Sequence, residues 1–166
     1  FYYGFSAVAW TAQGIAAGWV GALWSTGVAA EIALFAVSAR LFRGWSPAAL
    51  MVLGGCGAVA RWLLLSLAPP LVLLFPLQTL HALSFAAAYL GFLRYATDNA
   101  PENMAATAQA VNSALSGGLM LAAGTLVSGW AYARFGAGGF ALMAAPAGVG
   151  LACAALLQRR STKPPL

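Results

Sequence analysis

Five runs of apolar residues, each long enough to cross a lipid bilayer, constrain the fold of this chain more than any other feature. The runs cover residues 18–39, 47–67, 71–93, 105–130 and 140–157, and a partial run covers residues 1–10. A helix needs about 20 mostly apolar residues to span a membrane. Only 7% of the residues are charged, whereas a soluble domain carries about 25%. The sequence therefore predicts an all-α membrane protein, in which short connections make consecutive helices antiparallel neighbours.

The N-terminal stretch is about half as long as a span. The chain opens on Phe1, and neither a basic segment nor a small-residue cleavage site marks residues 1–10 as a signal peptide. We therefore expect residues 1–10 to be the end of a helix that begins upstream. Residues 1–166 are then expected to be one transmembrane domain, a fragment of a longer protein.

Positively charged side chains near the ends of the runs predict the orientation. When the chain alternates through five spans, Arg40, Arg43, Arg94 and the tail of residues 159–163 fall on one side, and Arg134 falls on the other. An excess of Lys and Arg marks the cytoplasmic side of a membrane. We therefore expect a multi-pass protein of the inner or plasma membrane with a cytoplasmic C-terminus. The net charge of +5 follows the ends of the runs and does not indicate a nucleic-acid surface.

Three ionisable side chains, Glu31, Arg61 and His81, lie near the middle of three consecutive runs. Charges at that depth are expensive, so they usually face a protein interior and mark a pathway for a solute or an ion. Arg61 cannot lose its proton and needs an acceptor nearby, and Glu31 is the only carboxylate of this sequence at matching depth. Histidine titrates near neutral pH, which suits proton-linked binding. The three residues are therefore predicted to bind substrate or to couple transport to protons.

Neighbouring polar and aromatic side chains are candidates for the lining of a cavity. Trp24 and Phe35 share the helix face of the carboxylate at helical spacing, and Gln78 and Ser84 lie one turn on either side of the histidine. Aromatic rings suit a stacked sugar or an aromatic acid, and for an acid the arginine would attract the carboxylate. Ordinary membrane packing and interfacial belts explain most of the aromatic residues of the sequence.

A polar face in residues 105–130 allows two interpretations. Gln109, Asn112, Ser113 and Ser116 recur at the spacing of one helix face. Gln109 and Asn112 could line the cavity. The same spacing serves hydrogen bonds between closely packed helices, and both interpretations stay open.

Metal, disulfide and enzyme chemistry have little support in the sequence. Cys56 and Cys153 lie in different runs and have no CxxC or Cys/His partner. The sequence contains no HExxH, no GxSxG and no glycine-rich phosphate loop. We expect no metal, no cofactor and no enzymatic activity.

Several segments resemble a known family of transporters. Leu23–Glu31, Ala58–Arg61 and Leu77–His81 are similar to its eighth, ninth and tenth helices, each with its ionisable residue. Ser128–Gly136 is similar to the loop before the last helix, and Ser38–Gly44 to a cytoplasmic loop motif. The chain resembles the C-terminal six-helix half of a major facilitator superfamily transporter, in the lactose-permease and phenylpropionate-permease-like branch.

The resemblance implies a twelve-helix transporter, in which these helices face a missing N-terminal half and a small organic solute binds between the halves. Transport would proceed by alternating access, driven by a proton gradient. By analogy, Glu31 contacts the solute or the proton, and Arg61 and His81 belong to the coupling network. Lactose permease has an acidic residue one turn after the histidine, where this chain has Ser84. Glu31 is then the leading proton carrier of this half, and the branch slightly favours an aromatic acid over a sugar.

A different function is compatible with the same helices. In a membrane bundle that transports nothing, Glu31, Arg61 and His81 would form a polar lock between helices. An ion pair in lipid is a costly way to fix packing, so the transporter is the favoured hypothesis.

Overall fold

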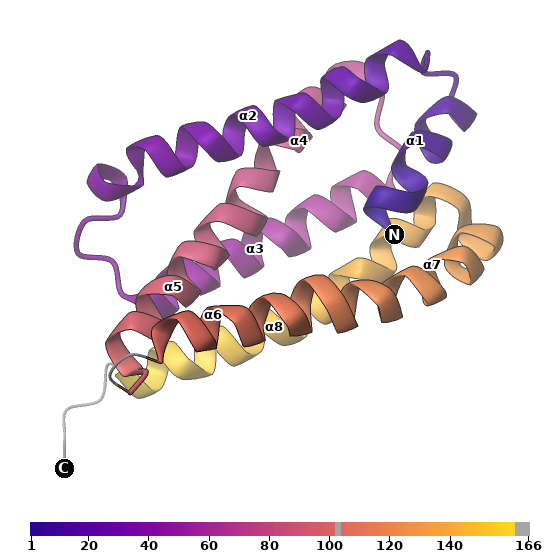
Figure 1. The fold of residues 1–166 in the computed structure, drawn as a ribbon. Helices are drawn as coiled ribbons and strands as arrows, with labels where there is room; N and C mark the ends of the chain where they lie inside the picture. The colour runs from indigo at the N-terminus through magenta and orange to yellow at the C-terminus, as the bar shows by residue number, and fades with distance from the viewer. Residues whose placement is uncertain (102–103, 162–166) are drawn as a thin grey trace.

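The computed structural model describes residues 1–101 and 104–161 as a bundle of helices (Figure 1). Glu102 and Lys163, which belong to the polar stretch and the basic tail of the sequence, lie outside the described residues. Within the described ranges, four helical stretches are long and apolar enough to cross a membrane. They are Gly18–Leu41, Pro47–Ser66, Leu71–Asn99 and Ala105–Arg160.

The bundle contains eight α-helices and three short segments of other helical types in the described residues. They are α1 (Tyr2–Ala12), α2 (Gly18–Leu41), α3 (Pro47–Ser66), α4 (Leu71–His81), η1 (Ala82–Ala87), α5 (Ala88–Asn99), α6 (Ala105–Ser113), η2 (Ala114–Met120), α7 (Leu121–Phe135), η3 (Gly136–Gly139) and α8 (Phe140–Ser161). The segments η1 and η2 are π-helical, so α4–η1–α5 and α6–η2–α7 are continuous rods.

Local sequence explains where the chain reverses. The side chain of Ser46 accepts a hydrogen bond from the backbone nitrogen of Ala49 (3.1 Å), and Pro47 occupies the first turn of α3; both are favourable at a helix start. Gly136 has a φ of 55° at the end of α7, a conformation that glycine adopts without a steric penalty. The chain turns back there, and α8 runs antiparallel to α7 (Figure 1).

Glycines let α3 lie against its neighbours with little separation. A Cβ placed on Gly54 would lie 2.7 Å from the Cβ of Ala88, and one on Gly57 would lie 2.6 Å from the Cβ of Leu83. A Cβ placed on Gly55 would lie 2.9 Å from the Cβ of Leu151 on α8. In a bilayer, helices associate through such close van der Waals packing rather than through the hydrophobic effect. Helix α3 therefore forms the centre of the bundle.

Replacing Gly54 by alanine is expected to destabilise the bundle by about 1–3 kcal/mol, because the added methyl group overlaps the backbone of Ala88. Thermal unfolding of the detergent-solubilised protein measures the change. The control is Gly148→Ala, because no atom lies within 4 Å of a Cβ placed on Gly148. Equal melting temperatures for the two variants would contradict the close α3–α5 packing.

The two ends of the bundle differ in character. At one end, an apolar cluster includes Phe1, Trp10, Leu23 and Phe140, all nearly fully buried. At the other end, Arg94 donates hydrogen bonds from Nη1 to the backbone oxygens of the α2–α3 connection, at 3.1 and 3.3 Å. The end of α8 lies at this same end, on the left of Figure 1. We call it the Arg94 end.

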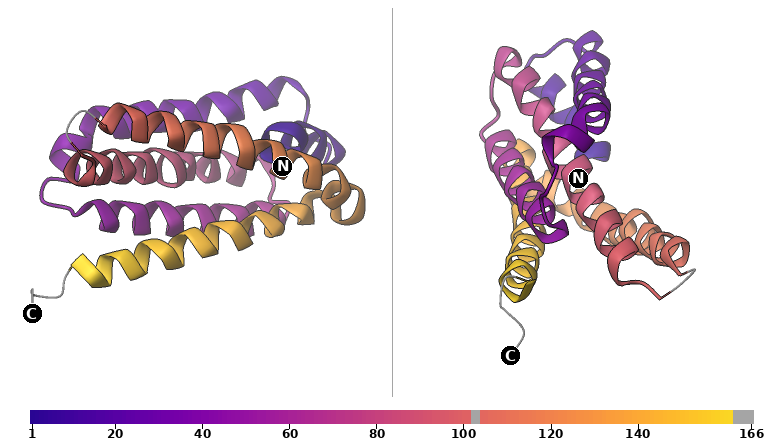
Figure 2. Two further views of the ribbon diagram at one scale, coloured as in Figure 1. Left: turned by 60° about the horizontal axis from the view of Figure 1, so that its bottom comes forward. Right: turned by 90° about the vertical axis from the view of Figure 1, so that its left-hand side faces the viewer.

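The rod α6–η2–α7 diverges from the rest of the bundle (Figure 2, right). Neither α6 nor η2 contributes a buried residue. By contrast, α7 buries Ser128 and Ala131 next to the apolar end. The part of this rod formed by α6 and η2 therefore exposes a long surface.

Candidate functional site

A chain of polar contacts joins the three ionisable residues that lie at mid-depth in the apolar runs. Glu31 is on α2, Arg61 on α3 and His81 at the end of α4. Helices α2 and α4 run in the same direction from the same end of the bundle (Figure 1). Residues at similar counts from the two helix starts therefore reach similar depth, and this brings Glu31 and His81 together.

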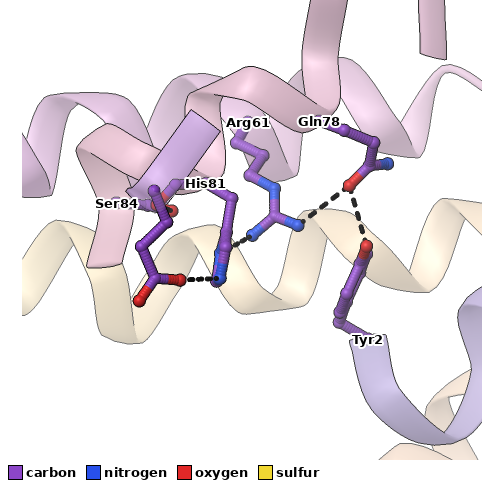
Figure 3. Close-up of polar contacts among 6 residues, drawn as sticks. Tyr2, Arg61, Gln78, His81 and Ser84 are labelled. Carbon is purple, nitrogen blue, oxygen red and sulfur yellow. Dashed lines mark hydrogen bonds and ion pairs between the residues drawn. The ribbon is translucent and has the colours of Figure 1, made fainter. Parts of the chain in front are cut away.

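His81 lies between the two charged groups. Its Nε2 is 3.2 Å from Oε2 of Glu31, and its Nδ1 is 3.2 Å from Nη1 of Arg61 (Figure 3). A guanidinium only donates hydrogen bonds, so Nδ1 must accept and the ring proton must be on Nε2. His81 is therefore a neutral ring that donates to the carboxylate of Glu31. The two charges are bridged by the histidine rather than paired directly.

Arg61 is held by groups on two other helices, α1 and α4, and by its neighbour Trp62 on α3. Its side chain is 2% exposed, and Nη2 donates to Oε1 of Gln78 at 3.2 Å. The hydroxyl of Tyr2 donates to the same Gln78 oxygen at 2.7 Å (Figure 3). The guanidinium carbon lies 4.5 Å from the ring centre of Tyr2 and 4.8 Å from that of Trp62. Cation–π contacts of this kind stabilise a guanidinium that has lost its water.

Two donors, one on this arginine and one on its neighbour, have no hydrogen-bond partner among the residues that the structure describes. They are Nε of Arg61 and Nε2 of Gln78, both buried. An unsatisfied buried donor costs about 1–3 kcal/mol, and such groups are rare in folded proteins. We call the residues joined by these contacts the polar cluster; they are Tyr2, Glu31, Arg61, Gln78 and His81. The polar cluster therefore retains unused hydrogen-bonding capacity.

A cavity of about 200 Å³ opens against the polar cluster. Its lining combines the arginine and the histidine with aromatic and small residues. The lining residues are Tyr2, Tyr3, Trp24, Gly27, Val28, Arg61 and His81. A cavity with a cation at one side and rings around it suits an organic anion that carries a flat apolar group.

Most of the predicted lining residues lie near this cluster. Trp24 lines the cavity, and its Nε1 donates to the hydroxyl of Ser6 at 3.2 Å. Gln78 contacts Arg61 directly. Phe35 lies one turn beyond the carboxylate and contacts the ring of Tyr89. The hydroxyl of Ser84 donates to the backbone oxygen of His81 at 3.3 Å, so its hydrogen bond is made within its own helix.

Gln109 and Asn112 do not join the polar cluster. They lie half-buried on α6, the rod that diverges from the bundle. Asn112 lines a separate hollow of about 460 Å³ between α5 and α6, next to Phe92 and Leu115. A helical period shows which residues share a face, but it does not show what that face meets.

Tyr2 and Trp62 contribute to the site although neither was among the predicted site residues. In the sequence, both resemble the aromatic residues that are common in membrane helices. The signal that could have distinguished them is their position in the sequence. Trp62 follows the buried arginine directly, and Tyr2 lies within the aromatic run of residues 1–3 that opens the partial first helix. As for metals, no group of three or more His, Cys, Asp or Glu side chains gathers within residues 1–101 and 104–161.

Comparison with known proteins identifies the family. Residues 1–142 match the MFS_1 like family. The chain is 38% identical over 143 residues to the probable 3-phenylpropionic acid transporter of Escherichia coli (strain K12), which is 86% of this chain and 38% of that protein. No solved structure matches significantly. The chain belongs to the MFS_1 like family of the major facilitator superfamily.

Proposed function

We propose that the chain is the C-terminal half of a proton-linked secondary transporter for a small aromatic carboxylate. The observation that carries this proposal is the buried guanidinium of Arg61 beside a ring-lined cavity, with Glu31 and His81 on the same contact chain. A buried cation with spare hydrogen-bonding capacity is a binding group for an anion.

Two considerations favour an aromatic acid over a sugar. The relative with 38% identity is named a probable 3-phenylpropionic acid transporter. The cavity offers three aromatic residues, Tyr2, Tyr3 and Trp24, and one cation. Rings provide stacking surfaces for a phenyl group, and a guanidinium binds a carboxylate with two parallel hydrogen bonds.

Charge balance in the cluster provides a reason for coupling to protons. With His81 neutral, the charges of Glu31 and Arg61 sum to zero. An incoming carboxylate would add an unbalanced negative charge to an apolar environment, which is costly. A proton on Glu31 removes that charge. The anion and the proton are therefore favoured to bind together, which is symport.

The same proposal includes the orientation of the bundle in the membrane and the partner domain that completes the transporter. The Arg94 end also carries Arg40 and Arg43, and we assign it to the cytoplasm because Lys and Arg concentrate there. The chain spans 38% of the length of its relative. Alternating access needs two lobes that rock against each other. We therefore propose an N-terminal half as the partner that closes the site.

The whole transporter, reconstituted in vesicles, is expected to accumulate 3-phenylpropionate when the outside is acidic, and not to accumulate lactose. The physical reason is that only the acid offers a charge for Arg61. Uptake of the two radiolabelled solutes measures the preference, with protein-free vesicles as the control. A protonophore should reduce the inside-to-outside ratio to one. Lactose uptake without 3-phenylpropionate uptake would overturn the solute assignment, and accumulation that resists the protonophore would overturn proton coupling.

A further inference from the structure

A row of aromatic rings continues from the polar cluster toward the Arg94 end of the bundle. We propose that Phe85, Tyr89 and Phe35 form a second ring-binding subsite, which holds the aromatic group of the solute on the opposite side of His81 from the cavity. This inference rests on the proposed function, since it assumes an aromatic carboxylate as the solute. The three residues are called the ring ladder below.

The rings of the ladder contact one another in sequence. Phe85 is stacked on the ring of His81, with centres 5.6 Å apart and planes at 20°. Tyr89 is stacked on Phe85 at 6.0 Å and 6°. Phe35, from α2, meets Tyr89 edge to face at 6.4 Å and 87°. These are favourable arrangements for aromatic rings, so the ladder is continuous with the histidine of the polar cluster.

The π-helical segment η1 keeps the ladder on one face. In an α-helix each residue turns by about 100°, so Tyr89 would be rotated by about 80° from His81 after eight residues. A π-helix closes its hydrogen bonds one residue further on and turns by a smaller angle per residue. The segment Ala82–Ala87 lies between the two residues and offsets that rotation. Segments of this kind are frequent at functional sites.

The ladder presents an open ring surface. Phe85 is 47% exposed, whereas Ala82, Ala86 and Ala87, on the packed side of the same segment, are buried. A half-exposed phenylalanine that is stacked on the histidine of the polar cluster is available to a ligand. Since it shares its face with His81, it borders the polar cluster, and this argues for a solute rather than another helix as its partner.

The cavity and the ladder lie on opposite sides of the polar cluster along the helices. Trp24 precedes Glu31 by two turns on α2, whereas Phe35 follows it by one turn. On the neighbouring rod, Phe85 and Tyr89 follow His81 in the same direction. A solute with its carboxylate at the cluster could therefore place its ring on the cavity side or on the ladder side. We assign the ladder side to the state that opens at the Arg94 end.

Two acids that differ only in the saturation of the ring test the ladder. We would measure the half-saturating concentrations of 3-phenylpropionate and 3-cyclohexylpropionate for the whole transporter, from each side of the vesicle membrane. For Phe85→Leu we expect the value for 3-phenylpropionate to rise about fivefold from the side of the Arg94 end, the size of one aromatic pair. The value for 3-cyclohexylpropionate should change less than twofold, because its ring has no π face.

Matched variants separate the ring from its volume. Phe85→Tyr keeps the ring and should retain the unaltered values, and Tyr89→Leu should reproduce the loss if Phe85→Leu fails to fold. Phe92→Leu removes a ring from the same rod outside the ladder and should have no effect. If Phe85→Leu and Tyr89→Leu change neither acid, or both acids equally, the ladder proposal is wrong although the proposed function stands. If the unaltered transporter moves neither acid, the proposed function fails and the ladder proposal fails with it.

Discussion

Replacing Arg61 by lysine will reduce 3-phenylpropionate uptake by the whole transporter about a hundredfold, the loss expected when a hydrogen bond to a charged group is removed from a buried site. Lysine keeps the positive charge but has no planar fork. Its single ammonium nitrogen therefore cannot occupy the positions of both Nη2 and Nη1, which donate to Gln78 and His81 in the arginine. Initial uptake rates in vesicles, divided by the amount of reconstituted protein, measure the effect.

A loss of uptake must be distinguished from a loss of folding. Melting temperatures in detergent report the stability of the Arg61→Lys variant, and a variant that melts near the unaltered protein but does not transport supports a role in solute binding. Arg134→Lys is the control, because Arg134 lies at the end of α7, far along the chain from the cluster. Near-normal uptake by Arg61→Lys would mean that the fork geometry is not used, and it would contradict the assignment of Arg61 as the carboxylate-binding group.

The grouping of Glu31, Arg61 and His81 could be predicted from the sequence for a simple physical reason. A membrane fixes the length of each span, so counting residues from the helix starts gives depth. Depth alone places a residue on a plane, and charged residues on that plane avoid lipid by turning toward one another. The 3.2 Å contacts of His81 are the geometric result. The transport roles of these residues stay predictions.

The order of the contacts could not be predicted, because it depends on the rotation of each helix about its own axis. We expected an acceptor beside Arg61, with Glu31 as the only carboxylate at matching depth, but His81 lies between the two charges. The rotation of α3 depends on glycines that allow close approach, such as Gly54 and Gly57. A π-helical segment has no reliable sequence pattern, so the ladder that η1 aligns was not visible either.

Replacing Glu31 by glutamine will abolish accumulation driven by a pH gradient, while exchange of labelled for unlabelled solute across the membrane continues. The amide oxygen of glutamine can still accept the hydrogen bond from Nε2 of His81, which is 3.2 Å from Oε2 in the unaltered chain. The substitution therefore keeps the contact and removes the group that takes up the proton. Vesicle uptake with and without a pH gradient, together with counterflow, measures the two activities separately.

The same variant separates the transporter from a bundle in which the buried charges only lock the helices. A lock depends on the strength of the contact, and a hydrogen bond to a neutral amide is weaker than one to a carboxylate. In a lock, Glu31→Gln should therefore lower the melting temperature and leave accumulation unchanged. A proton carrier depends on the ionisable group, so accumulation should be lost at a nearly unchanged melting temperature. Asp98→Asn, which removes a carboxylate from the last turn of α5, controls for the change in total charge. Undiminished accumulation by Glu31→Gln would show that Glu31 does not carry the proton. The contact between Glu31 and the neutral ring of His81 would then have no role in coupling.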